Sequence, residues 1–230
     1  MNKALIKIKK LFSGSAVRSV ATLASGSSAA QLLVLLSSPL LARLYTPEHF
    51  SILAVFVAVL KITVVVSSFR YHLAIPIAKN DGDAVSVVFL CMLLTSCVSV
   101  LVGLGARSLF YNELTSLPTY SRDLFVYALP LGILFTGFLQ TVRFWAVRTK
   151  NFKNMARARI NQALVSTAFQ ISFFSYGAVA LVVGLVTGRF SAGYRMTVAF
   201  WREGDRSEVS IRKIVNLAVK FKRFPLHSTY

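Results

Sequence analysis

The chain has 230 residues, of which 55% are hydrophobic and only 15% are charged, and its mean hydropathy is +0.63. This composition is unusual for a water-soluble domain of this size and favours a membrane protein. The 26 Lys and Arg residues exceed the 8 Asp and Glu residues by 18 charges, but they lie between long uncharged stretches, which disfavours a nucleic-acid-binding protein.

Four stretches have the length of a membrane span. A helix needs about 20 residues to cross about 30 Å of hydrocarbon. The ranges 19–42, 50–69, 84–106 and 124–142 meet this length, and the one formal charge within them, apart from their ends, is Lys61. The first range follows several lysines, as in a signal peptide, but it is too long for the apolar region of one.

A fifth uncharged run, 160–188, is too long for one span. Its 29 residues would make a helix of about 43 Å, which exceeds the hydrocarbon core at the usual tilt. We expect two shorter helices that turn near Ser175, Tyr176 and Gly177, where glycine allows a tight turn. The arginines at the outer ends of the run would then snorkel to the interface: Arg157, Arg159, Arg189 and Arg195.

The distribution of Lys and Arg favours six spans over five. With six spans and a cytoplasmic N-terminus, 21 basic residues lie on the inner side and three on the outer side, whereas five spans leave 12 on each side. Basic residues in short loops concentrate in the cytoplasm, so we expect both termini there.

Three segments follow from this topology. We expect a basic cytoplasmic N-terminus over 1–18, a six-helix transmembrane lobe over 19–190 and a basic cytoplasmic linker segment over 191–230. Within the linker, apolar and basic residues recur at mostly helical spacing over 210–224. This spacing predicts a helix that either lies on the anionic inner leaflet or forms a solvated linker.

Residue types that carry enzymatic or metal chemistry are missing from the spans. All eight acids fall in loops or in the tail, and the three histidines are scattered without ligand spacing. Neither a phosphate-binding glycine-rich loop nor an HExxH motif is present. Cys91 and Cys97 share one apolar run and are interpreted as buried packing residues. The sequence therefore predicts neither an enzyme, nor a cofactor, nor a metal site.

Three cations are the candidate substrate-binding residues. Lys61 falls near the middle of the second span, where a lone charge costs about 2.5 to 3.5 kcal/mol. Such a residue either faces a cavity in the bundle or snorkels from a tilted helix. Arg70, placed at the end of the same span, and Arg43, at the end of the first span, suit either a cationic cavity for an anionic substrate or an interfacial anchor. The positive-inside rule alone explains Arg143 and Arg148.

Several motifs resemble those of one transporter family. The range 43–50 (RLYTPEHF), preceded by Ser25-Gly26 and by Ser38-Pro39-Leu40, resembles the start of the bacterial polysaccharide-repeat flippases, which belong to the multidrug/oligosaccharidyl-lipid/polysaccharide exporter superfamily. Similar stretches follow along most of the chain: 69–76, the residues Trp145, Arg148, Lys150 and Phe152, and 221–226.

The resemblance implies an all-α fold of two six-helix lobes around a cavity that alternates between the membrane faces. A chain of this length resembles the N-terminal half. The implied function is flipping of undecaprenyl-diphosphate-linked oligosaccharide repeats across the bacterial inner membrane for O-antigen, capsule or exopolysaccharide synthesis. Arg43, Lys61 and Arg70 would face the cavity or its mouth, although Lys61 matches no family motif.

The implied partners are the lipid-linked oligosaccharide, membrane lipids, a polysaccharide polymerase, a chain-length regulator and, if the half-length chain works alone, a second copy of the chain. Three alternatives remain open. They are an exporter of drugs or of the peptidoglycan precursor, a membrane enzyme acting on lipid-linked sugars, and an inert or scaffolding remnant of a transporter. The 43–50 motif disfavours the first, and the lack of carboxylate pairs disfavours the second.

Overall fold

The computed structural model describes residues 14–78, 80–105, 119–203, 214 and 217. Within these ranges the structure is helical and contains no strand, which confirms the predicted all-α fold. The long helices of the described ranges are α2 (Gly14–Leu44), α3 (Pro47–Ser67), α4 (Asp81–Gly105), α6 (Thr119–Arg148), α7 (Phe152–Ser172) and α8 (Ala178–Glu203). Two short 3-10 helices, η1 (Tyr71–Ile77) and η3 (Phe174–Tyr176), lie in the connections.

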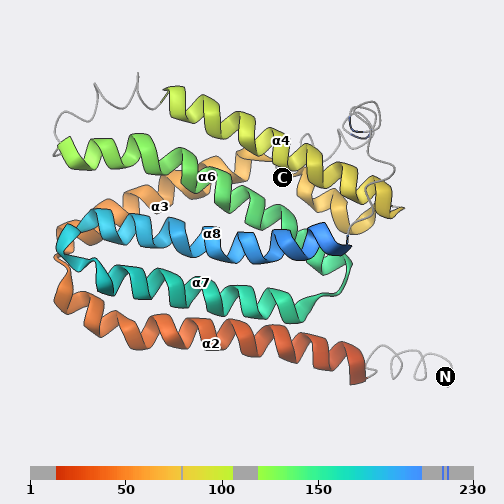
Figure 1. Ribbon diagram of the computed structural model, residues 1–230, viewed down its shortest axis with the longest axis horizontal. Helices are drawn as coiled ribbons and strands as arrows, with labels where there is room; N and C mark the ends of the chain where they lie inside the picture. The colour runs from red at the N-terminus through yellow and green to blue at the C-terminus, as the bar shows by residue number, and fades with distance from the viewer. Residues whose placement is uncertain (1–13, 79, 106–118, 204–213, 215–216, 218–230) are drawn as a thin grey trace, which may run out of the picture.

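The long helices run side by side in an order that differs from their order in the chain. Across the bundle the contacts run from α2 to α7, then to α8, α6 and α4, while α3 packs against both α6 and α8 (Figure 1). The first helix therefore packs on α7, far along the chain. We call the end of the bundle that holds residues 44–47 and 172–178 the hairpin end, because the α7–α8 turn lies there against the α2–α3 corner.

Four of these helices are long and apolar enough to cross a membrane: α2 from Ser19, α3, α4, and α6 from Val126. The chain is therefore a multi-pass membrane protein. The helices α7 and α8 are not among the helices with this length and apolar composition, so their crossing of the membrane stays a prediction. Their position supports it, because both lie between α2 and α6 in the bundle.

The predicted hairpin is confirmed as a helix–turn–helix. The turn is formed by η3 and by Gly177, whose φ of 55° is a backbone conformation that favours glycine. The two helices then approach closely through Gly184 and Gly188. A Cβ added to Gly188 would lie 2.7 Å from the carbonyl oxygen of Gln162 on α7, so the small residues allow this contact.

Some predicted boundaries differ from the structure. The second long helix ends at Ser67, because Phe69 and Arg70 adopt left-handed backbone angles that a helix cannot continue, so placing Arg70 within that span was wrong. The helix α8 extends to Glu203, past the predicted end of the lobe at 190. Cys91 is buried as expected, whereas Cys97 is exposed on α4. The predicted tail helix over 210–224 lies outside the described residues, except for Ile214 and Leu217.

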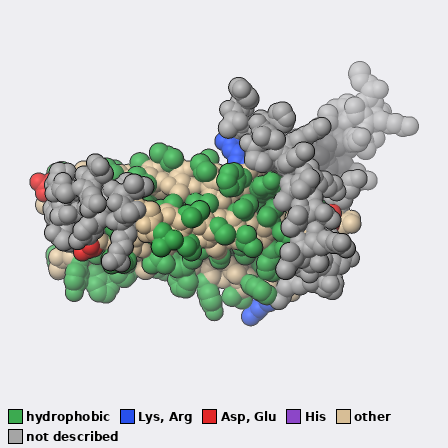
Figure 2. All heavy atoms as spheres, turned by 90° about the horizontal axis from the view of Figure 1, so that it is seen from above, with side chains coloured by type: hydrophobic (Ala, Val, Ile, Leu, Met, Phe, Trp, Pro, Cys, Tyr) green, Lys and Arg blue, Asp and Glu red, His purple; other side chains and the backbone are tan. Residues whose placement is uncertain are grey.

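Apolar side chains cover the outside of the bundle as well as its interior. Phe56 and Leu60 of α3 and Ile133 of α6 are fully buried between the helices. On the face seen in Figure 2, apolar side chains fill the middle, and the described charged groups lie toward its edges. Exposed leucines and valines of this kind match a lipid environment, in which an apolar outer surface is stable.

Candidate functional site

A groove of about 990 Å³ lies between α2, α3, α7 and α8. It extends along α2 from Ser27 to Ala42, which corresponds to about 22 Å of helix. The walls that α2, α3 and α8 contribute are mostly apolar. Their apolar residues are Ala30, Val34, Leu35, Pro39, Leu41, Ala42, Phe50, Leu53, Leu181 and Leu185.

The wall that α7 contributes is polar. Arg159, Gln162, Ser166 and Gln170 recur at intervals of three or four residues, so they form one stripe along the helix. This stripe explains why α7 lacks the apolar composition of a lipid-facing span. A polar stripe on a helix inside a membrane bundle marks a face that meets a cavity or another helix, because polar groups are costly in hydrocarbon.

Three arginines from α6, α7 and α8 lie near one another, and one of them, Arg159, lines the part of the groove that is far from the hairpin end. Arg143 of α6 donates a hydrogen bond to Gln162 Oε1 at 3.0 Å, and Arg159 donates one to the Ser27 hydroxyl of α2. Arg189 of α8 donates to Thr136 Oγ1 at 3.1 Å. We call these three residues the arginine cluster.

The positive charges of the arginine cluster act on one another and have no described counter-charge. Arg159 and Arg189 lie close enough to Arg143 to repel its guanidinium electrostatically. In the part of the chain that the structure describes, none of the three forms an ion pair, and their hydrogen-bond partners are neutral. Unpaired cations inside a membrane bundle are costly, so the cluster is suited to water or to an anion supplied by a ligand.

The hairpin end of the groove is held by Tyr45 of the RLYTPEHF motif. Its hydroxyl donates a hydrogen bond to the Gln170 carbonyl oxygen, and Gln170 Nε2 donates to the Leu181 carbonyl oxygen at 3.0 Å. Burial raises the pKa of the Tyr45 phenol, so the phenol stays protonated and keeps donating. The corner between α2 and α3 is thus tied to both α7 and α8.

The opposite end of the bundle is held by Arg148. It donates to Asp81 Oδ1 at 2.8 and 3.0 Å and to the carbonyl oxygens of Ile75 and Ala78 at 3.1 and 2.7 Å. These bonds join the end of α6 to η1, to Ala78 and to the start of α4, which together form one segment of the chain. Arg148 is therefore a structural residue rather than only a positive-inside charge.

A neutral histidine lies next to this segment. The His72 ring is buried, with Nε2 3.0 Å from Gln140 Nε2 and Nδ1 2.7 Å from Ser68 Oγ. Because the Gln140 amide nitrogen donates to Nε2, the proton of the neutral ring lies on Nδ1 and is donated to Ser68. Burial, with a smaller contribution from the charge of Arg70, lowers the pKa of His72 to about 4.

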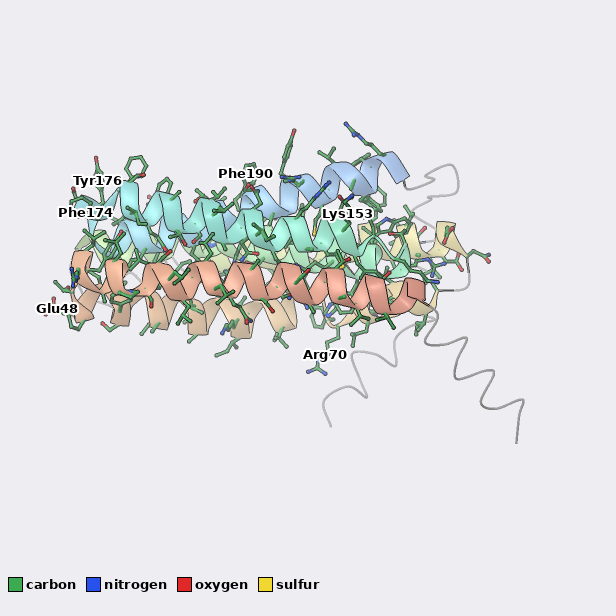
Figure 3. All side chains as sticks on the ribbon, turned by 90° about the horizontal axis from the view of Figure 1, so that it is seen from below. Glu48, Arg70, Lys153, Phe174, Tyr176 and Phe190 are labelled. Atoms are coloured by element: carbon green, nitrogen blue, oxygen red, sulfur yellow. The ribbon has the colours of Figure 1, made fainter. Side chains whose placement is uncertain are left out.

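None of the three cations predicted from the sequence lines the groove. Arg43 is exposed at the end of α2, and Arg70 points away from the bundle after α3 (Figure 3). Lys61 is exposed on α3, eleven residues after the groove residue Phe50, which puts the two within about 20° around the helix. Lys61 thus shares the groove-facing side of α3 but does not line the groove.

Lys61 and Arg159 also lie at a similar depth. Lys61 is fourteen residues from the start of α3 and Arg159 thirteen residues from the end of α7, and both of these helix ends are at the hairpin end. At 1.5 Å per residue, each lies about 20 Å along its helix from the hairpin end.

Sequence reasoning missed the arginine cluster and the polar wall. The sequence predicts only snorkelling groups at the ends of the uncharged run and a topological charge at Arg143. The signal that could have found the wall is the helical spacing of Arg159, Gln162, Ser166 and Gln170. Sequence alone could not bring Arg143 and Arg189 to Arg159, because the three residues come from three helices.

Metal ligands do not gather in the described residues: no group of three His, Cys, Asp or Glu side chains there could hold a metal ion. No curated protein and no solved structure matches the chain. A family model described as polysaccharide biosynthesis protein matches residues 16–222, which is most of the chain and includes every residue that lines the groove. The chain therefore belongs to the polysaccharide biosynthesis protein family.

Proposed function

We propose that this chain flips undecaprenyl-diphosphate-linked oligosaccharide repeats across the bacterial inner membrane for surface polysaccharide synthesis. The observation that carries the proposal is the groove between α2, α3, α7 and α8, which has mostly apolar walls and is lined by Arg159 of the arginine cluster, in a member of a polysaccharide biosynthesis family. An amphiphile with an anionic head and a hydrocarbon tail matches both parts of this surface.

The chemistry of the head group suits the arginine cluster. A diphosphate offers several anionic oxygens, and guanidinium groups bind phosphate through charge-assisted, often bidentate hydrogen bonds. The neutral partners Ser27, Thr136 and Gln162 hold the guanidinium groups without cancelling their charge. In this proposal the cluster holds the diphosphate and the apolar walls contact the lipid.

The three cations predicted from the sequence have a separate role in the proposal. Lys61, at the depth of Arg159, would contact the substrate at the mouth of the groove, with Arg70 and Arg43 nearer the two membrane surfaces. Both termini are proposed to be cytoplasmic. A second copy of the chain is the proposed partner that closes the groove, and a polymerase and a chain-length regulator are proposed to act on the product.

The test is complementation of a strain from which the gene has been deleted. We expect a lipid-linked repeat to accumulate in the deletion strain and the 230-residue chain to relieve it. Arg159→Gln should reduce the ability of the chain to relieve this accumulation at least tenfold, because the cation at the groove is lost. Arg157→Gln, two residues away on an exposed face of α7, should behave as wild type. Membrane-inserted protein is measured by immunoblot in each strain.

Lys61→Ala is compared in the same strain and is expected to lower export without lowering the amount of inserted protein. Normal export in both Arg159→Gln and Lys61→Ala would contradict the proposed substrate contacts. The absence of any accumulated lipid-linked repeat in the deletion strain would contradict the flippase itself, and would favour a scaffolding role or another exported substrate.

A further inference from the structure

A second, smaller pocket lies between the start of α7 and the end of α8. It has a volume of about 360 Å³ and is lined by the first turn of α7 and the last turns of α8. Its polar lining residues are Asn154, Tyr194, Arg195 and Arg202. Nothing in the proposed transport uses these residues, and none of them lines the groove.

The pocket carries concentrated positive charge. Arg195 and Arg202 are seven residues apart on α8, which puts them on one face two turns apart. Both are exposed, neither forms an ion pair within the described residues, and the pocket lining contains no acid. Asn154 and the Tyr194 hydroxyl add neutral hydrogen-bonding groups beside the two guanidinium groups.

An aromatic ridge leads from the pocket toward the middle of the bundle. The rings of Tyr194 and Phe190 lie 6.3 Å apart, and Phe190 lies 4.9 Å from Phe135 of α6. Phe190 is 49% exposed and Tyr194 63% exposed, so this ridge faces the surroundings of the bundle. In Figure 3, Phe190 and Lys153 lie on the same side of the bundle, opposite Arg70.

The position of the pocket along the bundle indicates which class of ligand it binds. It lies at the end of α8 that is far from the hairpin end, at the level of the α6–α7 connection, where helices of this length leave the hydrocarbon core. Exposed Tyr and Trp side chains, here Tyr194 and Trp201, are typical of the membrane interface. Basic pockets between helices at the cytoplasmic interface bind the head groups of anionic lipids.

We propose that this pocket is a binding site for an anionic glycerophospholipid of the surrounding leaflet. Its phosphodiester lies between Arg195 and Arg202, its head-group hydroxyls reach Asn154 and Tyr194, and an acyl chain follows Phe190 along α8. The site holds a lipid of the membrane rather than the transported one, so it rests on the proposed cytoplasmic position of this end of α8 but not on the proposed transport.

The experiment uses the full chain reconstituted in vesicles of equal parts phosphatidylglycerol and phosphatidylcholine. The protein is released into mild detergent, and retained lipids are counted by native mass spectrometry. Wild type is expected to retain one phosphatidylglycerol. The double variant Arg195→Gln/Arg202→Gln should retain at least about tenfold less, because both phosphate contacts are lost.

Two further variants separate the pocket from the general charge of the surface. Lys150→Gln/Arg157→Gln removes two exposed charges from the same end of the bundle, outside the pocket, and should retain the lipid as wild type does. Ala199→Trp keeps both arginines but fills the pocket and should lose the lipid. The proposal would be overturned if Lys150→Gln/Arg157→Gln lost as much phosphatidylglycerol as Arg195→Gln/Arg202→Gln. It would also be overturned if Ala199→Trp retained the lipid as wild type does.

Competition distinguishes a lipid site from a simple phosphate site. Inorganic phosphate or glycerol phosphate at millimolar concentration should leave the phosphatidylglycerol bound, because neither contacts the aromatic ridge. Displacement by either small anion, or equal retention of phosphatidylcholine, would overturn the assignment to an anionic lipid.

Discussion

At the scale of single residues, arginines in similar sequence positions, near the ends of apolar runs, have different roles. Arg148 donates four hydrogen bonds, two to the Asp81 carboxylate and two to backbone carbonyl oxygens, so its charge is compensated and it holds the chain in place. Arg159 has a single described hydrogen bond, to the Ser27 hydroxyl, and retains its charge toward the groove. The difference lies in the partners, which only the fold brings together.

His72 predicts a dependence of stability on pH. The unfolded histidine has a pKa near 6.5 and the folded one a pKa of about 4, so the unfolded chain binds the proton first as the pH falls. The free energy of unfolding should therefore be highest above about pH 6.5 and fall toward about pH 4, by at most about 1.4 kcal/mol per pH unit.

The measurement is thermal unfolding of the detergent-solubilised protein between pH 7.5 and 4.5, compared with His72→Gln. The variant keeps a neutral polar side chain next to Gln140 and Ser68 but cannot titrate, so its unfolding temperature should depend less on pH. Parallel curves for the two proteins would show that His72 does not cause the dependence.

At the scale of elements, the α7–α8 hairpin shapes the groove. The glycines of α8 let it pack closely on α7, and the polar stripe of α7 is directed to the groove that α2 borders. The sequence predicted where the hairpin turns, since Gly177 interrupts a run too long for one span. The sequence did not predict that the polar groups of α7 face α2, because the direction they face depends on which helix packs beside α7.

Gly177→Ala should destabilise the hairpin. An alanine there would adopt an unfavourable backbone conformation at φ 55°, and its Cβ would lie 2.7 Å from His49 Nε2. Strain of this kind costs about 1 to 3 kcal/mol, so the unfolding temperature should fall.

Gly105→Ala is the matched control, because an added Cβ there meets nothing within 4 Å, and it should be neutral or slightly stabilising. Adding His49→Ala to Gly177→Ala should recover only part of the lost unfolding temperature, namely the part that comes from the contact between the added Cβ and the His49 ring. Equal unfolding temperatures for the two single glycine variants would contradict the role of the turn.

At the scale of the whole molecule, the order of helices in space creates the groove. The helix α2 packs on α7 rather than along α3. The helices α2 and α3 therefore border the groove instead of filling it. The same order puts α7 and α8 between two helices with the composition of membrane spans. This position supports the predicted six-span topology, although only four of the described helices are long and apolar enough to cross a membrane, and the crossing of α7 and α8 stays a prediction.

This topology predicts the sides on which two positions lie. Ser175 is exposed in the α7–α8 turn, so a Ser175→Cys variant lacking Cys91 and Cys97 should react with a membrane-impermeant maleimide from outside the cell. A reporter fused after Tyr230 should report the cytoplasm. A cytoplasmic Ser175 or a periplasmic reporter would contradict the six-span count.

The sequence by itself determined the membrane class, the all-α fold, the hairpin and the family. These follow from local properties: the length of apolar runs, the interruption by glycine and motifs that are continuous in the chain. Only the tertiary structure brought cations from three helices close to one another. Lys61 stood out because it is alone in an apolar span, whereas Arg143, Arg159 and Arg189 each lie at the edge of one. Their proximity arises from the packing of α6, α7 and α8, and contacts between distant segments leave no local pattern in the sequence.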